Sequence, residues 1–142
     1  MIWTKDGGLV LAGGTSSTPG SGEVGNDPAR GSVDFWMVKF DVDNQQVTWA
    51  HRYGGFAEDF AYAVLERRED SKLLIGGTSK SSPATGGNCA NCKRSEFFGD
   101  RDFWMVETDQ NGKMLRDWSF GGSGLDVLYQ IKETLFGQIL IA

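Results

Sequence analysis

The pentapeptide Asp-Phe-Trp-Met-Val occurs twice in this chain, at residues 34–38 and again at residues 102–106. Each copy is followed by the same order of residues: an aspartate, a tryptophan, a Gly-Gly pair, an aspartate and a tyrosine. These are Asp41, Trp49, Gly54, Gly55, Asp59 and Tyr62 in the first copy, and Asp109, Trp118, Gly121, Gly122, Asp126 and Tyr129 in the second. Such a repeat predicts successive structural units, because one short unit cannot bury its own apolar faces and must stack on the next.

A second recurring segment relates the ends of the chain to this repeat. Residues 9–16, 73–79 and 139–142 share an apolar run, which ends in Gly-Gly in the first two copies. When the two Gly-Gly pairs are aligned, Ala142 matches Ile75, so both ends are expected to lie within a unit. The alignment predicts a single domain with unit portions at about residues 1–53, 54–120 and 121–142.

Each unit is predicted to consist of four short antiparallel strands. In the middle unit we expect strands at residues 60–66, 73–78, 103–107 and 114–120. The pair Asn111-Gly112 is typical of a tight turn between the last two of them, since both residues tolerate a positive φ. No window shows helical periodicity.

The apolar pattern of the strands distinguishes between all-β architectures. Residues 35–38 and 73–75 are continuous apolar runs, which indicate strands with both faces covered rather than one wet face. Stacked four-stranded blades of a β-propeller provide this environment. An immunoglobulin-like sandwich is the alternative, but its strands should alternate in polarity and it does not explain a four-strand repeat. We therefore expect a segment of a β-propeller with between two and three blades.

Composition limits the possible partners. The 142 residues carry a formal net charge of −5, with 14 basic and 19 acidic residues. This balance argues against a nucleic-acid surface, which needs clustered Lys and Arg. No apolar run approaches the roughly 18 residues that cross a bilayer, so no membrane insertion is expected. No signal peptide is visible at the N-terminus.

The repeated segments resemble the bacterial β-propeller repeat found in tandem arrays of secreted and cell-surface proteins. The matching stretches are DFWMVKFD, TWAHRYGGFAEDFAYAV and DFWMVETDQNGKMLRDWSFGGSGLDVLYQI, and DGGLVLAGGTSS fits the remaining part of the pattern. Kelch repeats are a more distant relative. The resemblance implies a propeller of roughly seven or eight blades and a secreted or cell-surface location, often reached by type IX secretion. The Asp-Gly-Gly of the family pattern is absent at residues 69–71 and 135–137.

The recurring aromatic and acidic residues are interpreted as scaffold. Trp36/Trp104 and Trp49/Trp118 are expected at equivalent positions between units, although exposed tryptophans could also stack on a ligand. Asp59 and Asp126 follow Gly-Gly at the same interval. We expect each carboxylate to accept backbone N–H groups in the turn between units, with a pore or metal site as the alternative.

Asp41, Asp43 and Asn44 form a weak candidate for a metal site, because hard cations bind clustered oxygens at alternate positions. The stretch lacks the glycine and distal glutamate of a calcium-binding loop, so a hairpin turn is the favoured interpretation. No cofactor is expected.

Cys89 and Cys92 form the only cysteine motif. A zinc site lacks further ligands, since His51 is the only histidine, and a thioredoxin-like role would need a helix after the motif. In an exported protein a local disulfide is favoured over free thiols, with metal binding a weaker alternative.

The cysteine pair lies in the loop at residues 79–100, whereas the corresponding loop at residues 16–33 has no cysteine. Together with Phe97 and Phe98, this difference makes the loop the candidate for a recognition role specific to one unit.

No catalytic residues are predicted, because no Ser/His/Asp or Cys/His order and no phosphate-binding glycine loop is present. The sequence predicts a non-enzymatic interaction or structural module that contacts further blades of a longer chain or other copies of itself, and whose ligand is a protein or a glycan. The alternative is part of a propeller enzyme acting on glycans, with catalytic residues in blades outside this sequence.

Overall fold

The computed structural model describes residues 1–83 and 89–142, and this part of the chain is all-β. Its strands are β1 (Ile2–Trp3), β2 (Leu9–Thr15), β3 (Asp34–Asp41), β4 (Gln46–Tyr53), β5 (Asp59–Glu66), β6 (Leu73–Ser79), β7 (Asp102–Thr108), β8 (Met114–Phe120), β9 (Ile131–Glu133) and β10 (Ile139–Ile141). A 3-10 turn, Gly22–Val24, is the one helical element of the described residues. None of the described residues forms a helix long and apolar enough to cross a membrane.

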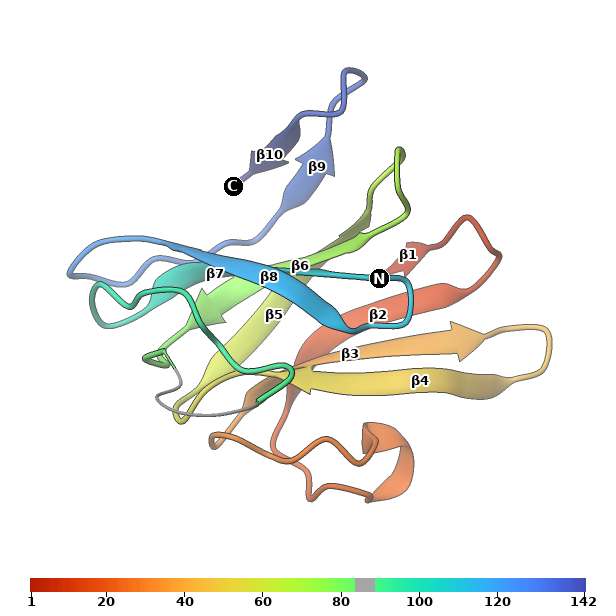
Figure 1. The fold of residues 1–142 in the computed structure, drawn as a ribbon, viewed down its shortest axis with the longest axis horizontal. Helices are drawn as coiled ribbons and strands as arrows, with labels where there is room; N and C mark the ends of the chain where they lie inside the picture. The colour runs from red at the N-terminus through yellow and green to blue at the C-terminus, as the bar shows by residue number, and fades with distance from the viewer. Residues whose placement is uncertain (84–88) are drawn as a thin grey trace.

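The strands form two four-stranded antiparallel sheets and one hairpin. The first sheet has the order β1-β2-β3-β4, the second has the order β5-β6-β7-β8, and β9 pairs with β10. The four strands expected in the middle unit are confirmed within one residue at each end. Short turns gather at one end of the sheets, which we call the turn end (Figure 1). The long connection at residues 16–33 and the described residues of the connection between β6 and β7 lie at the opposite end, which we call the loop end.

The second sheet lies between the first sheet and the β9–β10 hairpin (Figure 1). One apolar cluster, which includes Phe35, Met37 and Ile75, fills the space between the two sheets. A second cluster around Leu74, Leu128 and Ile131 joins the second sheet to the hairpin. All seven residues of β6 are buried, so the prediction of strands covered on both faces is confirmed there.

The same backbone contacts recur at the two junctions. At the loop end, the N–H of Asp59 donates to the carbonyl of Val33 at 2.8 Å, and the N–H of Asp126 donates to that of Arg101 at 2.7 Å. At the turn end, the N–H of Lys5 donates to Oε2 of Glu66 at 2.8 Å. One unit later, the N–H of Arg68 donates to Oε2 of Glu133 at 2.9 Å. The hairpin therefore packs on the second sheet as the second sheet packs on the first.

The alignment of the Gly-Gly pairs is wrong by one residue. The turn at residues 67–72 is one residue longer than those at residues 4–8 and 134–138. As a result, Ile141 pairs with Ile131 as Ile75 pairs with Val64, and Ala142 does not match Ile75.

The expected equivalence of Trp49 and Trp118 is also wrong. Trp49 lies opposite Lys39, whereas Trp118 lies opposite Met105. Trp118 is therefore two positions further along β8 than the place that corresponds to Trp49 in β4. Arg116 occupies the place that corresponds to Trp49, and His51 the place that corresponds to Trp118. The ring of Trp49 stacks on His51 at 5.5 Å, and Arg116 lies over Trp118 at 4.8 Å. Each sheet therefore pairs a tryptophan with a His or Arg side chain at these two places, in the opposite order along the strand.

Packing between the units accounts for two of the four tryptophans that recur in the repeat. Trp104 is fully buried and its ring centroid lies 4.5 Å from that of Phe35 in the opposite sheet. The indole N–H of Trp49 donates to the carbonyl of Gln110 in the β7–β8 turn at 3.2 Å. Trp36 lies on the outer face of the first sheet, where no further sheet formed by the described residues packs.

Candidate functional site

The two junctions have a corresponding pair of carboxylates at the loop end, both buried at the first junction and one of them, Asp126, partly exposed at the second. A Cβ atom added to Gly54 would lie 2.5 Å from Asp34 Oδ1 and 2.7 Å from Asp59 Oδ2, so the two carboxylates meet across this glycine. At the second junction, Gly121 lies between Asp102 and Asp126 with corresponding distances of 2.4 and 2.7 Å. Each junction therefore brings together the aspartate of Asp-Phe-Trp, the first glycine of the Gly-Gly pair that follows it and the aspartate after that pair.

These carboxylates hold the backbone of the connecting turns. Asp59 Oδ2 accepts the N–H of Gly55 at 2.9 Å, and Asp126 Oδ2 accepts the N–H of Gly122 at 3.0 Å, which confirms the scaffold role expected for both residues. Burial raises the pKa of Asp59 to about 6, despite hydrogen bonds that favour its charged form. Burial also raises the pKa of Asp34.

The connection at residues 80–101, which we call the cysteine loop, docks on the first sheet through residues 91–93. Cys89 and Cys92 are joined in a disulfide. Cys92 forms a parallel bridge with Gly54 just beyond the end of β4, and the N–H of Lys93 donates to the carbonyl of Gly54 at 2.8 Å. The loop thus belongs to the second unit but extends the edge of the first.

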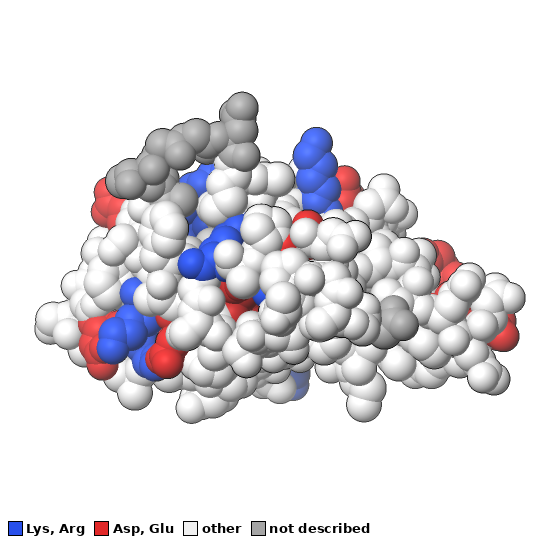
Figure 2. Space-filling model, turned by 90° about the horizontal axis from the view of Figure 1, so that it is seen from below, with Lys and Arg blue, Asp and Glu red and all other residues white. Residues whose placement is uncertain are grey.

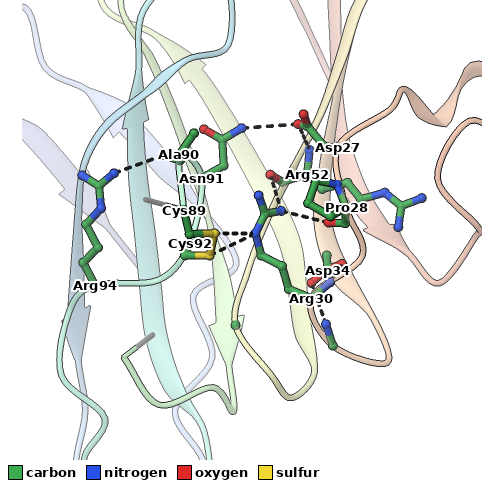
Figure 3. The surroundings of a disulfide bond; sticks show 12 residues. Asp27, Pro28, Arg30, Asp34, Arg52, Cys89, Ala90, Asn91, Cys92 and Arg94 are labelled. Atoms are coloured by element: carbon green, nitrogen blue, oxygen red, sulfur yellow. Dashed lines mark hydrogen bonds between the residues drawn. A yellow bond between two sulfur atoms is a disulfide. The ribbon is translucent and has the colours of Figure 1, made fainter. Parts of the chain in front are cut away.

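Arg30, from the connection at residues 16–33, reaches the disulfide (Figure 3). Its Nε lies 3.3 Å from Cys89 Sγ and 3.2 Å from Cys92 Sγ. Its Nη1 donates to the carbonyls of Pro28 and Arg52, at 3.3 and 3.2 Å. Within the described residues Arg30 forms no ion pair, and burial lowers its pKa.

Asp27 joins both loops to the first sheet. Its Oδ2 lies 2.9 Å from Nδ1 of His51 and accepts the N–H of Arg52 at 3.1 Å and the side-chain amide of Asn91 at 3.3 Å. Burial opposes ionisation of Asp27, but the hydrogen bonds from His51 and Arg52 lower its pKa on balance. The bond to Asp27 raises the pKa of His51.

Lys93 is fully buried beside the disulfide. Its Nζ donates to the carbonyl of Ser81 at 2.9 Å and lies 5.5 Å from the ring centroid of Phe97. Burial lowers the pKa of Lys93, and the charges of Asp102 and Asp59 oppose that shift. Lys93 thus lies near one carboxylate from each of the two junctions.

The structure separates the predicted recognition residues. Phe97 is half-buried against Lys93, whereas the side chain of Phe98 is exposed and its N–H donates to Asp102 Oδ2 at 2.9 Å. Phe56, Phe120 and Leu125 are further large exposed apolar residues in or beside the loop-end connections. The loop end therefore presents several apolar side chains over a rigid, hydrogen-bonded base.

The candidate metal residues lie at the turn end, far along the strands from this network. Asp41 Oδ1 accepts the N–H of Asn44 at 3.0 Å and Asp41 Oδ2 accepts its side-chain amide at 2.8 Å, and these bonds lower the pKa of Asp41. Asp43 and Asn44 line a hollow of about 300 Å³ next to this turn. Among the described residues no three acidic, cysteine or histidine side chains come together to hold a metal ion.

Several residues of the loop end have no counterpart in the repeat. Asp27, Arg30, Asn91 and Lys93 lie in connections that differ between units, so no repeating pattern could identify them. The position of Lys93 directly after the cysteine motif was the one available signal. The sequence also does not indicate the tilted contact between Tyr62 and Tyr129, two partly exposed side chains whose ring centroids are 5.4 Å apart.

Charge on the visible surface is sparse. Figure 2 shows a face of mostly uncharged residues, on which the basic and acidic side chains lie in small groups. No family model matches this chain, and no curated protein sequence matches it.

Proposed function

We propose that this chain is a segment of a β-propeller, in which each four-stranded sheet is one blade and the β9–β10 hairpin is the beginning of a third. The observation that carries the proposal is that the same contacts recur at both junctions. At the turn end, the backbone N–H groups of Lys5 and Arg68 donate to the carboxylates of Glu66 and Glu133. At the loop end, the backbone N–H groups of Asp59 and Asp126 donate to the carbonyls of Val33 and Arg101. When successive units pack in the same way, each unit is rotated by the same angle relative to the one before it, so a sufficient number of units can close into a ring.

The outer faces of the stack support the need for further blades. The first sheet has Trp3 and Leu11 exposed by 66% and 39% on its outer face, and the hairpin has Leu140 exposed by 57%. Large exposed apolar side chains on a face mark an interaction surface. The partners of these faces are further blades of a longer chain or other copies of this one.

Light scattering tests this architecture. At micromolar concentration the 142-residue chain should associate, because both outer faces are apolar. Lys132→Glu combined with Leu140→Glu, which places two acidic side chains on the outer face of the hairpin, should reduce the association. A soluble wild-type monomer with both faces exposed would contradict the proposal.

For the biochemical role, we infer a non-enzymatic interaction module of a secreted or cell-surface protein that binds a glycan or protein through its loop end. The support is the contrast between the conserved geometry of the two junctions and the different loops above them. Exposed aromatic rings such as Phe56 and Phe98 suit contact with a sugar face or a protein surface.

A defined glycan array, followed by titration of any bound glycan, tests this role. Phe56→Ala and Phe98→Ala should each weaken binding, whereas Phe136→Ala at the turn end, where the ring is even more exposed, should not. Equal binding by all three variants would contradict a loop-end site. Release of shortened glycan during incubation would instead favour the alternative, a propeller enzyme.

A further inference from the structure

We propose that Cys89 and Cys92 form a redox-active pair, which an external dithiol reduces and in which Arg30 stabilises Cys92 as a thiolate. The proposal does not depend on a ligand at the loop end or on closure of a propeller. It assigns chemistry to a cysteine pair that the scaffold of the second unit does not require, since the first unit has the same junction without cysteines.

The position of the guanidinium carries the argument. Nε of Arg30 lies 3.2 Å from Cys92 Sγ and 3.3 Å from Cys89 Sγ. A neutral disulfide gains little from an adjacent cation, whereas a thiolate gains a charge-assisted hydrogen bond. Arg30 therefore favours the reduced form over the oxidised form.

The remaining contacts of Arg30 leave its charge available to the sulfurs. Its other guanidinium hydrogen bonds go to the neutral carbonyls of Pro28 and Arg52, and Asp34 accepts the backbone N–H of Arg30 rather than its side chain. No ion pair within the described residues neutralises the guanidinium. The carboxylates of Asp34 and Asp27 act on the guanidinium without a side-chain hydrogen bond to it, whereas a thiolate at Cys92 would accept its Nε–H directly.

Burial gives the two sulfurs different roles. Cys92 is 7% exposed, whereas Cys89 is partly exposed and so is the accessible point of attack. A thiolate of the dithiol forms a bond to Cys89 Sγ, the disulfide breaks, and its electron pair leaves on Cys92 Sγ next to Arg30. The second thiolate of the reagent then attacks its own sulfur in the mixed disulfide, and Cys89 leaves and takes a proton from water. The chain gains two electrons and the reagent becomes a cyclic disulfide.

Reduction would also loosen the contact between the two sheets at the loop end. The disulfide closes a tight ring from which Asn91 donates to Asp27 and accepts the N–H of Met114 at 3.3 Å. Cys92, which ends that ring, and Lys93, which follows it, pair with Gly54. Opening the ring frees the segment that spans the first and second sheets, so the oxidation state would set how firmly the loop is docked.

Equilibration of the whole chain with mixtures of reduced and oxidised dithiothreitol, followed by alkylation and mass measurement, tests the proposal. Arg30→Met should shift the equilibrium at least tenfold towards the disulfide, a change of about 30 mV. Arg94→Met is the matched control, because Arg94 contacts the same loop through the carbonyl of Ala90 and does not contact the sulfurs (Figure 3). It should shift the equilibrium less than twofold. Equal shifts in the two variants would overturn the proposal.

A measurement on the unaltered chain keeps the test independent of any folding defect in Arg30→Met. After reduction, the pH dependence of alkylation at Cys92 should show a thiol pKa at least one unit below the ordinary value of about 8.5. A value at or above about 8.5 would show that Arg30 does not stabilise the thiolate and would leave a purely structural disulfide.

Discussion

The hydroxyl of Tyr53 in β4 donates to the carbonyl of Gly112 in the β7–β8 turn, at 2.5 Å, across the interface between the two sheets. Tyr53 is fully buried, and burial raises its pKa well above the usual range. The neighbouring inward residues of β4, Trp49 and His51, contact the same turn. Three alternate side chains of one strand therefore hold one turn of the next sheet.

Replacement of Tyr53 by phenylalanine should lower the free energy of unfolding by about 1–3 kcal/mol, because the carbonyl of Gly112 loses its partner in a buried place. Urea unfolding followed by tryptophan fluorescence measures this change. Tyr62→Phe is the control, since half of the Tyr62 side chain is exposed, and it should have little effect. Equal stability of the two variants would contradict a role for the Tyr53 hydroxyl in docking the sheets.

The pair of His51 and Asp27 should make stability depend on pH near neutrality. The pKa of His51 is raised in the folded state, so its contribution is fully present below the unfolded value of about 6.5 and is lost as the pH rises through the higher folded value. The effect should be about 1 kcal/mol or less, since both side chains are partly exposed.

Unfolding at pH 5.5 and at pH 8.5 compares the wild type with His51→Gln, which should lose less stability over this interval. Asp27→Asn should return the pKa of His51 towards its ordinary value in an NMR titration. A histidine pKa that does not change in Asp27→Asn would rule out this origin of the pH dependence.

Asp59 should have an influence of the same direction at lower pH. Burial raises its pKa to about 6, so the folded state binds the proton more tightly than the unfolded state, and stability from this group falls as the pH rises from about 4 to 6. The cost above pH 6 is on the order of 3 kcal/mol. Asp59→Asn should therefore flatten this part of the profile relative to the wild type, whereas Asp126→Asn, at the more open second junction, should change it less. Parallel profiles for Asp59→Asn and the wild type would contradict this assignment.

Gly54 should not tolerate a side chain. A Cβ atom there would approach the carboxylates of Asp34 and Asp59 at 2.5 and 2.7 Å, and both are fixed by hydrogen bonds to turns. Gly54→Ala should lower the midpoint of urea unfolding, by an amount equivalent to about 1–3 kcal/mol. Gly13→Ala is the matched control, because no atom lies within 4 Å of its added Cβ, and it should stay within about 0.5 kcal/mol of the wild type. Similar midpoints for both variants would argue against the tight meeting of carboxylates.

Strand positions were predictable because the apolar runs are local signals. The run at Leu73–Ser79 is buried at every position, so its continuous apolar character reports directly on its surroundings. Register was not predictable in the same way. The extra residue at residues 67–72 displaces the second Gly-Gly pair relative to the strand pairing, and the different positions of Trp49 and Trp118 become visible only from their partners on β3 and β7.

The loop-end network was not predictable because its members come from separate loops. Asp27 and Arg30 lie about 60 residues before Asn91 and the disulfide in the sequence, and neither loop repeats the other. The cysteine motif indicated a local bridge, but nothing in the sequence placed a guanidinium beside it. Contacts of this kind depend on how the two sheets pack, and that packing brings the loops together.

The alternation of Trp49, His51 and Tyr53 along β4 has a consequence for how the chain avoids errors during folding. A slip of β4 by one residue against β3 would turn all three side chains to the opposite face of the first sheet. The second sheet would then have no hydroxyl, indole or imidazole to receive its β7–β8 turn. Docking of the second sheet therefore adds its contacts only to the correctly paired hairpin and stabilises that pairing over the slipped ones.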